Sequence, residues 1–313
     1  MMRHFKRSIL FILMGIAIFL LMETFAFKQS AVNKDIYRSI KLAETAGPYP
    51  EVILGDSVGR QLFPTSPGEK SLYLTSNQAI SMVGQYILLD KYLSRFPGRV
   101  KKVILILHPY SLTNNLDQKW SFNYFLLPFF SRENDRYFSP LVFSLMENCK
   151  YCYLYRQGFI KKFINKHLEN FQVDFSTLNN HPFGFSGFQD VNRIYLAPIT
   201  LEYLKKLDRL CRQNHIKFHL YCPPISKHFY PENFFIKSQL RENGLTEMFS
   251  DYFAKMVLLE DDAFKHDLIH YKTGYHKRYR KAIIRNMRIE SIEFPVEAGN
   301  KLPPLKYRLA TQK

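Results

Sequence analysis

Cysteine is scarce in this chain, which has only 4 among its 313 residues. So few cysteines in so long a chain exclude a small fold that is held together by disulfides. Cys149 and Cys152 have the spacing of a redox or metal-binding pair, but no second pair matches it to complete a tetrahedral zinc site. We therefore expect buried free thiols, with a Cys149–Cys152 disulfide as the alternative if this region lies outside the cytoplasm.

Acidic residues are also under-represented. The chain has 27 Asp and Glu against 44 Lys and Arg, which gives a formal net charge of +17. A field of this sign attracts anionic lipid, acidic glycan or nucleic acid. The sequence has neither zinc-finger spacing nor the aromatic signature of RNA-binding domains, so nucleic acid is not an expected partner. A generally basic surface without a dedicated partner is the alternative.

The longest apolar run lies at the N-terminus. Residues 8–27 are almost wholly apolar and follow a flank that contains Arg3, Lys6 and Arg7. About 20 such residues can cross the hydrocarbon core of a membrane as a helix, and the basic flank stays in the cytoplasm. No small-residue cleavage site follows, so a signal anchor in the inner membrane is favoured over a cleaved signal peptide. We expect the rest of the chain to be extracytoplasmic, in the periplasm or at the cell surface.

Strand-like and helix-like patterns alternate through residues 51–290, which predicts an α/β domain with a parallel sheet flanked by helices. We divide the remainder into 1–28 (basic flank and anchor), 29–50 (stalk) and 291–313 (basic tail). An aromatic segment, 113–195, interrupts the alternation and is expected to be a helical insertion over the carboxyl edge of the sheet. Its aromatic side chains either build a private core or form a lid, a glycan-stacking surface or a membrane-contacting patch. The expected strands are 52–55, 71–75, 100–107, 216–221 and 256–259, and the expected helices 35–44, 79–96, 196–214, 232–250 with a break at Gly244, and 272–289.

The first expected strand ends in Gly55-Asp56-Ser57, with a further glycine at Gly59. This pattern predicts a buried strand that stops abruptly and presents one hydroxyl in the turn that follows. A serine in this position acts as a nucleophile if a base can reach it. The alternative is that Ser57 caps the next helix, because Ser is a preferred N-cap residue.

Asp267 and His270 lie three residues apart, just before the last expected helix. On one helical turn, the carboxylate can face the imidazole Nδ1 while Nε2 takes a proton from a serine. The alternative is an ordinary helix start with Asp267 as its cap. Sites in open parallel sheets form at the carboxyl ends of strands, so the Ser57 and His270 loops can meet. Nearby His266 and His276 have no diagnostic metal-binding spacing, and we expect neither a metal nor another cofactor.

These two motifs together resemble those of the SGNH/GDSL hydrolase superfamily, and the resemblance extends over residues 50–287. It implies a flavodoxin-like, three-layer fold for an SGNH-like catalytic domain. By resemblance, Ser57 is the nucleophile, His270 the general base and Asp267 the residue that orients the base.

The middle motifs depart from the family pattern. Where the family supplies a glycine N–H to the oxyanion hole, this chain has Ser76-Asn77, and where it supplies an asparagine side chain, this chain has His108-Pro109-Tyr110-Ser111. Arg60, one turn beyond the nucleophile, is a candidate to hold an anionic substrate group, with a solvated surface charge as the alternative. The candidate oxyanion or substrate-binding groups are Ser76, Asn77, Tyr110, Ser111, Arg60 and the Ser57 N–H.

The order of features is similar to the branch of this superfamily that modifies cell-envelope polymers, such as the D-alanine-transfer proteins of the teichoic acid pathway and the alginate O-acetylation proteins. The resemblance implies transfer or removal of a small acyl group on an envelope polysaccharide or anionic glycan. A transferase of this kind would have a membrane-bound, acyl-exporting partner. The alternatives are a lipid esterase, or a non-catalytic glycan-binding or scaffold protein on a degenerate SGNH fold.

Overall fold

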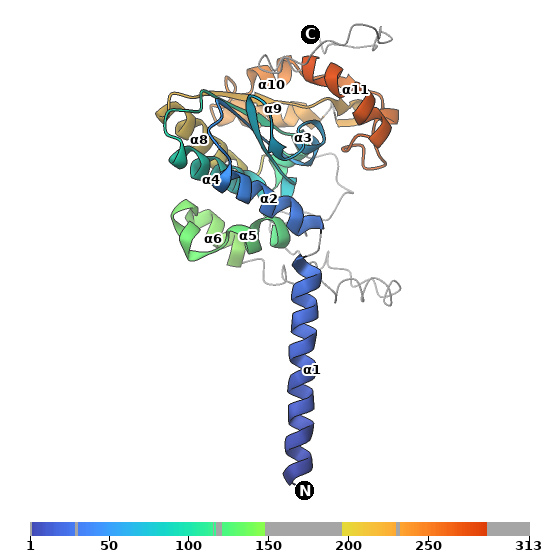
Figure 1. Cartoon of the computed structure of the whole chain (residues 1–313). Coiled ribbons are helices and arrows are strands. Elements are labelled where there is room, and N and C mark those ends of the chain that lie inside the picture. The colour runs from blue at the N-terminus through green and yellow to red at the C-terminus, as the bar shows by residue number, and fades with distance from the viewer. Residues whose placement is uncertain are drawn as a thin grey trace.

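The computed structural model describes residues 2–28, 31–114, 116, 121–147, 196–229 and 232–286 (Figure 1). At its centre lies a five-stranded sheet of order β2-β3-β1-β4-β5. The two pairings of β1 and the pairing of β4 with β5 are parallel, whereas the short β2 is antiparallel to β3. This confirms the predicted α/β class with a mostly parallel sheet. The strands are β1 (Glu51–Gly55), β2 (Ser66–Pro67), β3 (Ser71–Thr75), β4 (Lys102–Ile106) and β5 (Lys217–Tyr221).

Helices cover both faces of the sheet. Helices α2, α4 and α8 pack together on one face, and α3 and α11 contact each other on the other (Figure 1). The helices are α1 (Met2–Lys28), α2 (Ala31–Thr45), α3 (Ser57–Leu62), α4 (Ser81–Arg95), α5 (Leu127–Phe129), α6 (Pro140–Glu147), α8 (Pro198–Gln213), α9 (Glu232–Glu242), α10 (Ser250–Ala254) and α11 (Thr273–Asn286). Short 3-10 turns are η1 (Gln78–Ile80), η2 (Pro109–Thr113), η4 (Arg132–Tyr137), η7 (Lys227–Phe229) and η8 (Asp261–Ala263), and η3 (Phe122–Leu126) is a π-helical turn.

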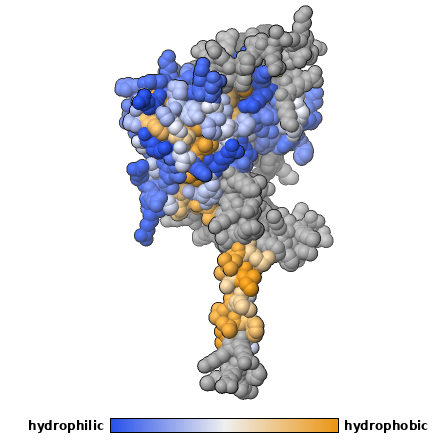
Figure 2. Space-filling model, viewed as in Figure 1, coloured by the Kyte–Doolittle hydropathy of each residue, from blue (hydrophilic) through white to orange (hydrophobic). Residues whose placement is uncertain are grey.

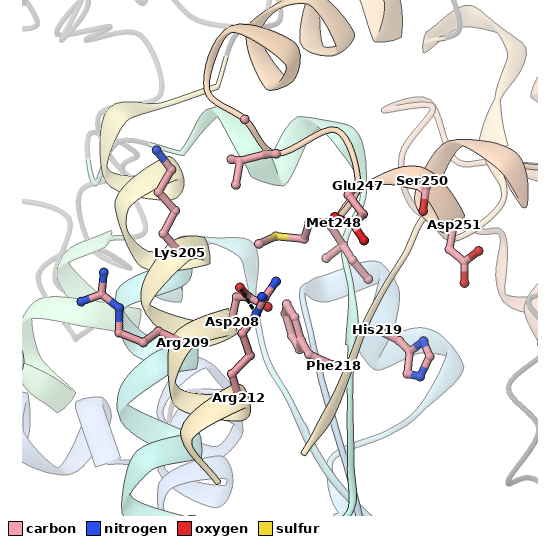
Figure 3. Close-up of a pocket in the computed structure, with 13 residues that line it drawn as sticks. Lys205, Asp208, Arg209, Arg212, Phe218, His219, Glu247, Met248, Ser250 and Asp251 are labelled. Atoms are coloured by element: carbon pink, nitrogen blue, oxygen red, sulfur yellow. Dashed lines mark ion pairs between the residues drawn. The ribbon is translucent and has the colours of Figure 1, made fainter. Parts of the chain in front are cut away.

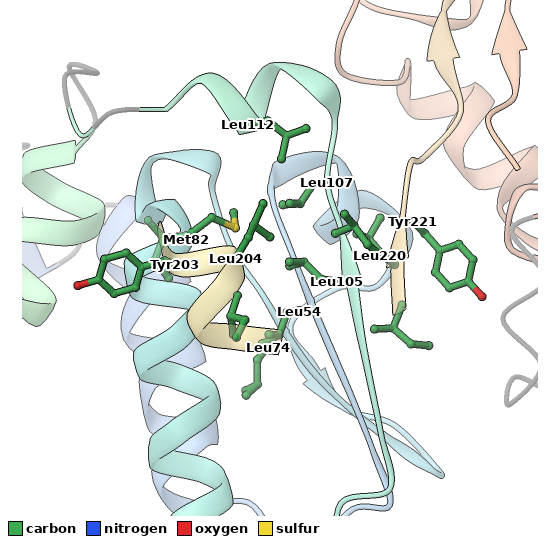
Figure 4. Packing of buried hydrophobic residues seen from close by; sticks show 14 of the residues in the cluster. Leu54, Leu74, Met82, Leu105, Leu107, Leu112, Tyr203, Leu204, Leu220 and Tyr221 are labelled. Atoms are coloured by element: carbon green, nitrogen blue, oxygen red, sulfur yellow. The ribbon is translucent and has the colours of Figure 1, made fainter. Parts of the chain in front are cut away.

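The core lies between the sheet and these helices. Leu54 on β1 pairs in register with Leu74 on β3 and with Leu105 on β4, so three leucines form one row across the sheet. Met82 of α4 and Leu204 of α8 pack over this region, and all five side chains are buried (Figure 4). Each fully buried side chain of this size contributes about 1.5–3 kcal/mol, which fixes the strands and therefore the loops at their ends.

The sheet topology places the end of β1 at a switch point. The chain passes from β1 to β3 on one side, and then back across β1 to β4 on the other. Crevices at the carboxyl ends of strands form where the strand order reverses in this way. Ser57 lies two residues beyond the end of β1, at the edge of the sheet where open α/β folds bind ligands.

The predicted stalk, 29–50, contains the expected amphipathic helix as α2, but this helix is part of the folded domain. Ile36, Ser39 and Ala43 are fully buried, and the Ser39 hydroxyl donates a hydrogen bond of 3.1 Å to the Thr75 carbonyl at the end of β3. Helix α2 thus covers the sheet and does not belong to a stalk outside the domain.

Helix α1 extends away from the domain (Figure 1) and exposes a run of apolar side chains between Ile9 and Met22, coloured orange in Figure 2. No helix in the described part of the chain combines the length and apolar character that a membrane span requires. The predicted transmembrane anchor is therefore unsupported. The tail 291–313, and residues 148–195 of the insertion with Cys149 and Cys152, lie outside the described residues.

Two further elements refine the predicted order. The last expected strand, 256–259, forms β7 (Leu258–Leu259), which pairs with β6 (Ile225–Ser226) in a separate two-stranded sheet. The expected break at Gly244 is confirmed, because this glycine adopts a positive φ of 69° between α9 and α10. Cys211 and Cys222 are buried free thiols, as expected, and burial raises the pKa of both.

Candidate active site

Ser57 is the first residue of α3, and Asp56 is the residue that caps this helix. One carboxylate oxygen of Asp56, Oδ1, accepts hydrogen bonds of 2.9 Å from the backbone N–H groups of Val58 and Gly59. This satisfies two of the N–H groups that a helix start leaves unpaired. Ser57 is therefore not the cap, and that alternative is wrong. Its hydroxyl is available for another partner, although the residue is only 4% exposed.

Two glycines allow α3 to lie close to the end of β4. A Cβ atom on Gly55 would lie 2.8 Å from the Ile106 carbonyl oxygen, and a Cβ atom on Gly59 would lie 3.2 Å from the same atom. The first distance is shorter than side-chain carbons tolerate. The requirement for glycine here is close approach of two backbones rather than an unusual φ angle.

His270 reaches the serine hydroxyl. Its Nε2 lies 2.8 Å from the Ser57 Oγ, and its Nδ1 lies 2.8 Å from the Asp267 Oδ2, although Ser57 and His270 are 213 positions apart in the sequence. Both distances fall within the range of about 2.6–3.2 Å that proton transfer between side chains requires. The structure thus brings together the three residues that the sequence predicted as a catalytic set.

The loop that carries Asp267 and His270 is a turn rather than the expected helical turn. The Asp267 Oδ1 accepts hydrogen bonds of 2.9 Å from the backbone N–H groups of Ile269 and His270, and Leu268 has a positive φ of 54°. Helix α11 begins only at Thr273, so Asp267 is not its cap. The spacing of three residues works because this turn folds the carboxylate back against the imidazole.

The same hydrogen bonds keep Asp267 ionised. Partial burial acts to raise the pKa of Asp267, but hydrogen bonds from the His270 amide, the His270 ring and the Ile269 amide outweigh it and lower the pKa below its ordinary value. An ionised carboxylate holds the Nδ1–H tautomer of the ring and stabilises the imidazolium that forms when Nε2 accepts a proton.

Asp56 also joins α3 to the loop that follows β4. Its second oxygen, Oδ2, accepts hydrogen bonds of 2.7 Å from the His108 N–H and of 2.5 Å from the Ser111 hydroxyl. Burial raises the pKa of Asp56, although all four hydrogen bonds act to lower it. This role of Asp56 was not predicted, although an aspartate at a strand-to-helix junction is itself a signal for an N-cap.

The predicted oxyanion residues have different surroundings. The Ser111 hydroxyl is used by Asp56, and the Ser76 N–H donates to the Gly55 carbonyl at 2.9 Å. The side chain of Asn77 accepts from the Ala79 N–H, and the Tyr110 N–H donates to the His108 Nδ1. By contrast, the Ser57 N–H makes no hydrogen bond to any described residue, as expected for the first residue of a helix.

Arg60 forms an ion pair with Asp35 of α2. Burial raises the pKa of the Tyr124 phenol, which belongs to the insertion, and the charge of Arg60 acts to lower it. An anionic substrate group at Arg60 would therefore compete with a carboxylate that is already in place. The predicted substrate-binding role of Arg60 stays a prediction.

The sequence shows no match to any protein-family model, and the search of curated proteins found no significant match. The site is therefore interpreted from its geometry. In the described ranges, no group of three or more His, Cys, Asp or Glu side chains is placed to hold a metal ion.

A separate cavity of about 650 Å³ lies between α8, β5 and the segment that leads into α10 (Figure 3). Charges of both signs line it, and two of them, Arg212 and Asp208, form an ion pair of 2.8 Å. Phe218 contributes an aromatic ring. None of the three residues Ser57, Asp267 and His270 lines this cavity, so it is distinct from the site at the end of β1.

Proposed function

We propose that this protein is a serine O-acyltransferase or esterase of the SGNH type. The observation that carries the proposal is the chain of two 2.8 Å contacts from Asp267 through His270 to Ser57. A buried serine that meets a histidine Nε2, with a carboxylate on Nδ1, is the arrangement that nucleophilic acyl transfer needs. Its position at the switch point of a parallel sheet supports a ligand-binding role for the same residues.

The reaction follows from these contacts. The Ser57 Oγ attacks the acyl carbonyl carbon while its proton passes to the His270 Nε2, and the carbonyl π electrons move onto the oxygen. When this intermediate collapses, the bond to the leaving alcohol breaks and His270 returns the proton to that oxygen, which leaves an acyl-serine. Water or a sugar hydroxyl then attacks the acyl-serine, with His270 acting again as base and acid. General base catalysis of this kind contributes about 10²–10⁴-fold to the rate.

The oxyanion would form next to the start of α3. The Ser57 N–H is available there, and the positive end of the helix backbone favours the developing negative charge. The Ser111 hydroxyl donates to Asp56 and does not serve as a second donor. The oxyanion therefore needs at least one donor besides the Ser57 N–H.

The substrate class follows from the resemblance and from charge. We propose an acyl ester on an envelope polysaccharide or another anionic glycan, because a net charge of +17 favours an acidic polymer. A location outside the cytoplasm, and an acyl-exporting partner in the membrane, belong to the same proposal. Fractionation of cells, followed by protease treatment of intact spheroplasts, tests the location: the proposal requires the domain to be cleaved from outside.

One observation favours a second candidate, a lipid esterase. Leu127 and Phe130 near α5, and Phe143 of α6, are exposed apolar side chains of the insertion. A surface of this kind suits an enzyme that works at a lipid interface. The two candidates are separated by comparing hydrolysis of an acetylated polysaccharide with hydrolysis of long-chain ester micelles.

A fluorophosphonate probe tests the shared chemistry, because it phosphonylates an activated serine. We expect the wild type to be labelled, the Ser57→Ala variant not to be labelled, and the matched control Ser66→Ala, which removes an exposed hydroxyl on β2, to be labelled like the wild type. A folded wild-type protein that takes no label would overturn the proposal and favour a non-catalytic glycan-binding or scaffold protein.

A further inference from the structure

His108 is a buried histidine that the reaction described above does not use. It follows β4, and its ring is fully buried. The ring nitrogen Nδ1 accepts a hydrogen bond of 3.1 Å from the Tyr110 N–H. A neutral imidazole carries one proton, so an Nδ1 that accepts leaves that proton on Nε2. Burial, and then the nearby His270, lower the pKa of His108 to about 3, so the ring is neutral at physiological pH.

The Nε2–H of His108 has no hydrogen-bond partner within the part of the chain that the structure describes. Buried donors without partners are rare in folded proteins, and they mark places where a water, an ion or a ligand group binds. On one side the ring is closed by Phe229, whose ring centre lies 4.9 Å away in an edge-to-face arrangement. The unpaired N–H is thus held on a rigid ring, one side of which is apolar.

The strand register places His108 beside Ser57. Gly55 at the end of β1 pairs with Ile106 at the end of the neighbouring β4, and Ser57 and His108 each lie two residues beyond their member of that pair. The Asp56 carboxylate joins the two segments, since it caps α3 and accepts from the His108 N–H at 2.7 Å.

We propose that His108 is a catalytic residue whose Nε2–H donates a hydrogen bond to the oxyanion. This inference rests on the proposed function and supplies the second donor that the site needs. No proton is transferred: when the Ser57 Oγ–carbon bond forms, the carbonyl oxygen gains the π electrons, and the Nε2–H stabilises that charge. The ring suits the task, because with a pKa of about 3 it is neutral at physiological pH and does not act as a base there.

The neighbouring Ser111 is less suited, because its hydroxyl already donates to Asp56. His108 stands where the SGNH family pattern has an asparagine donor, so an imidazole N–H would replace an amide N–H. The His108 Nε2–H donates to no acceptor among the described residues, so it makes no hydrogen bond that stabilises the fold.

Two substitutions test the inference through kinetics. His108→Leu removes the donor and keeps a buried apolar side chain, and we expect kcat for p-nitrophenyl acetate to fall by about 10²–10³-fold with little change in KM, as for loss of one oxyanion donor. His108→Gln keeps an N–H donor, and we expect it to recover part of that loss. Equal kcat values for the wild type and a folded His108→Leu variant would overturn the inference.

A spectroscopic measurement on the wild type removes any dependence on how the variants fold. The protein is labelled with ¹⁵N-histidine and converted to the phosphonylated Ser57 adduct, whose phosphoryl oxygen occupies the place of the oxyanion. We expect the Nε2–H proton of His108 to shift downfield on adduct formation. If Ser57 reacts but this resonance does not move, the proposed function stands and the role of His108 is wrong. If Ser57 does not react at all, both fall.

Discussion

The Asp56 carboxylate and the His108 backbone amide are joined by a hydrogen bond of 2.7 Å. Asp56 starts the helix that carries the nucleophile, and His108 follows the neighbouring strand. The bond therefore fixes the spacing between the two loops at the carboxyl edge of the sheet. Because Asp56 is buried and accepts four hydrogen bonds, its contribution is structural rather than chemical.

Substitution of Asp56 should expose this role. In Asp56→Asn the Oδ1 atom still caps α3, but an amide N–H₂ replaces Oδ2 and faces two donors, so we expect a loss of about 1–3 kcal/mol in the free energy of unfolding. Asp56→Ala leaves all four donors unpaired and should cost about 3 kcal/mol or more. Urea denaturation measures both values.

The control for these variants is Asp262→Asn, which changes an exposed carboxylate in the loop before the Asp267 turn. A surface change of this kind should stay within about 0.5 kcal/mol of the wild type. If Asp56→Ala is as stable as this control, the carboxylate does not hold the two loops together.

The close approach of β1 to β4 at their carboxyl ends predicts a second effect. Gly55→Ala introduces a carbon 2.8 Å from the Ile106 carbonyl oxygen, and because that oxygen belongs to a backbone inside the sheet, either β1 or β4 must move. We expect a loss of about 1–3 kcal/mol in stability, together with slower fluorophosphonate labelling of Ser57. Gly47→Ala is the matched control, since a Cβ atom at that position has no other atom within 4 Å. Unchanged labelling in a Gly55→Ala protein would show that the spacing of β1 and β4 before Ser57 is not critical.

The lowered pKa of Asp267 predicts that the stability of the fold depends on pH. Its pKa is lower in the folded chain than in the unfolded chain, so the folded state binds fewer protons. The stability that this gives is complete above the unfolded-state value of about 3.9 and is lost as the pH falls through the lower folded-state value. The wild type should therefore exceed Asp267→Asn in stability at neutral pH, and the difference should shrink as the pH is lowered below about 4.

Urea denaturation of both proteins across this range measures the difference. Asp262→Asn serves again as the control, and its difference from the wild type should stay small throughout. If the wild type and Asp267→Asn differ in stability by the same amount at acid and at neutral pH, the pKa of Asp267 is not lowered by folding.

Local sequence patterns predicted much of the sheet and the three central side chains. The strand expected at 71–75 is β3 with the same bounds, and β1, β4 and β5 lie within two residues of their expected limits. Apolar, β-branched runs that end in Gly, Asp or Ser carry this information locally. The meeting of Ser57 and His270 could be predicted because parallel strands bring their carboxyl ends to one edge.

Other features depend on contacts that no local pattern contains. Helix α2 was expected within a stalk, and only its packing on β3, through Ser39 and Thr75, shows that it belongs to the domain. The short strand β7 was expected in the main sheet but pairs with β6. The role of His108 depends on its tautomer, which is set by the Tyr110 N–H, and on an unpaired nitrogen that is visible only in three dimensions.

The central claim is tested most directly by one rate, that of fluorophosphonate labelling of Ser57. This rate is compared between the wild type and His270→Gln, which lacks the imidazole. Peptide mass spectrometry assigns the label to Ser57, and thermal denaturation confirms that His270→Gln is folded. The imidazole Nε2 lies 2.8 Å from the serine oxygen and acts as its base. We therefore expect the variant to react about 10²-fold more slowly, or slower still. Equal rates in the two proteins would contradict the claim.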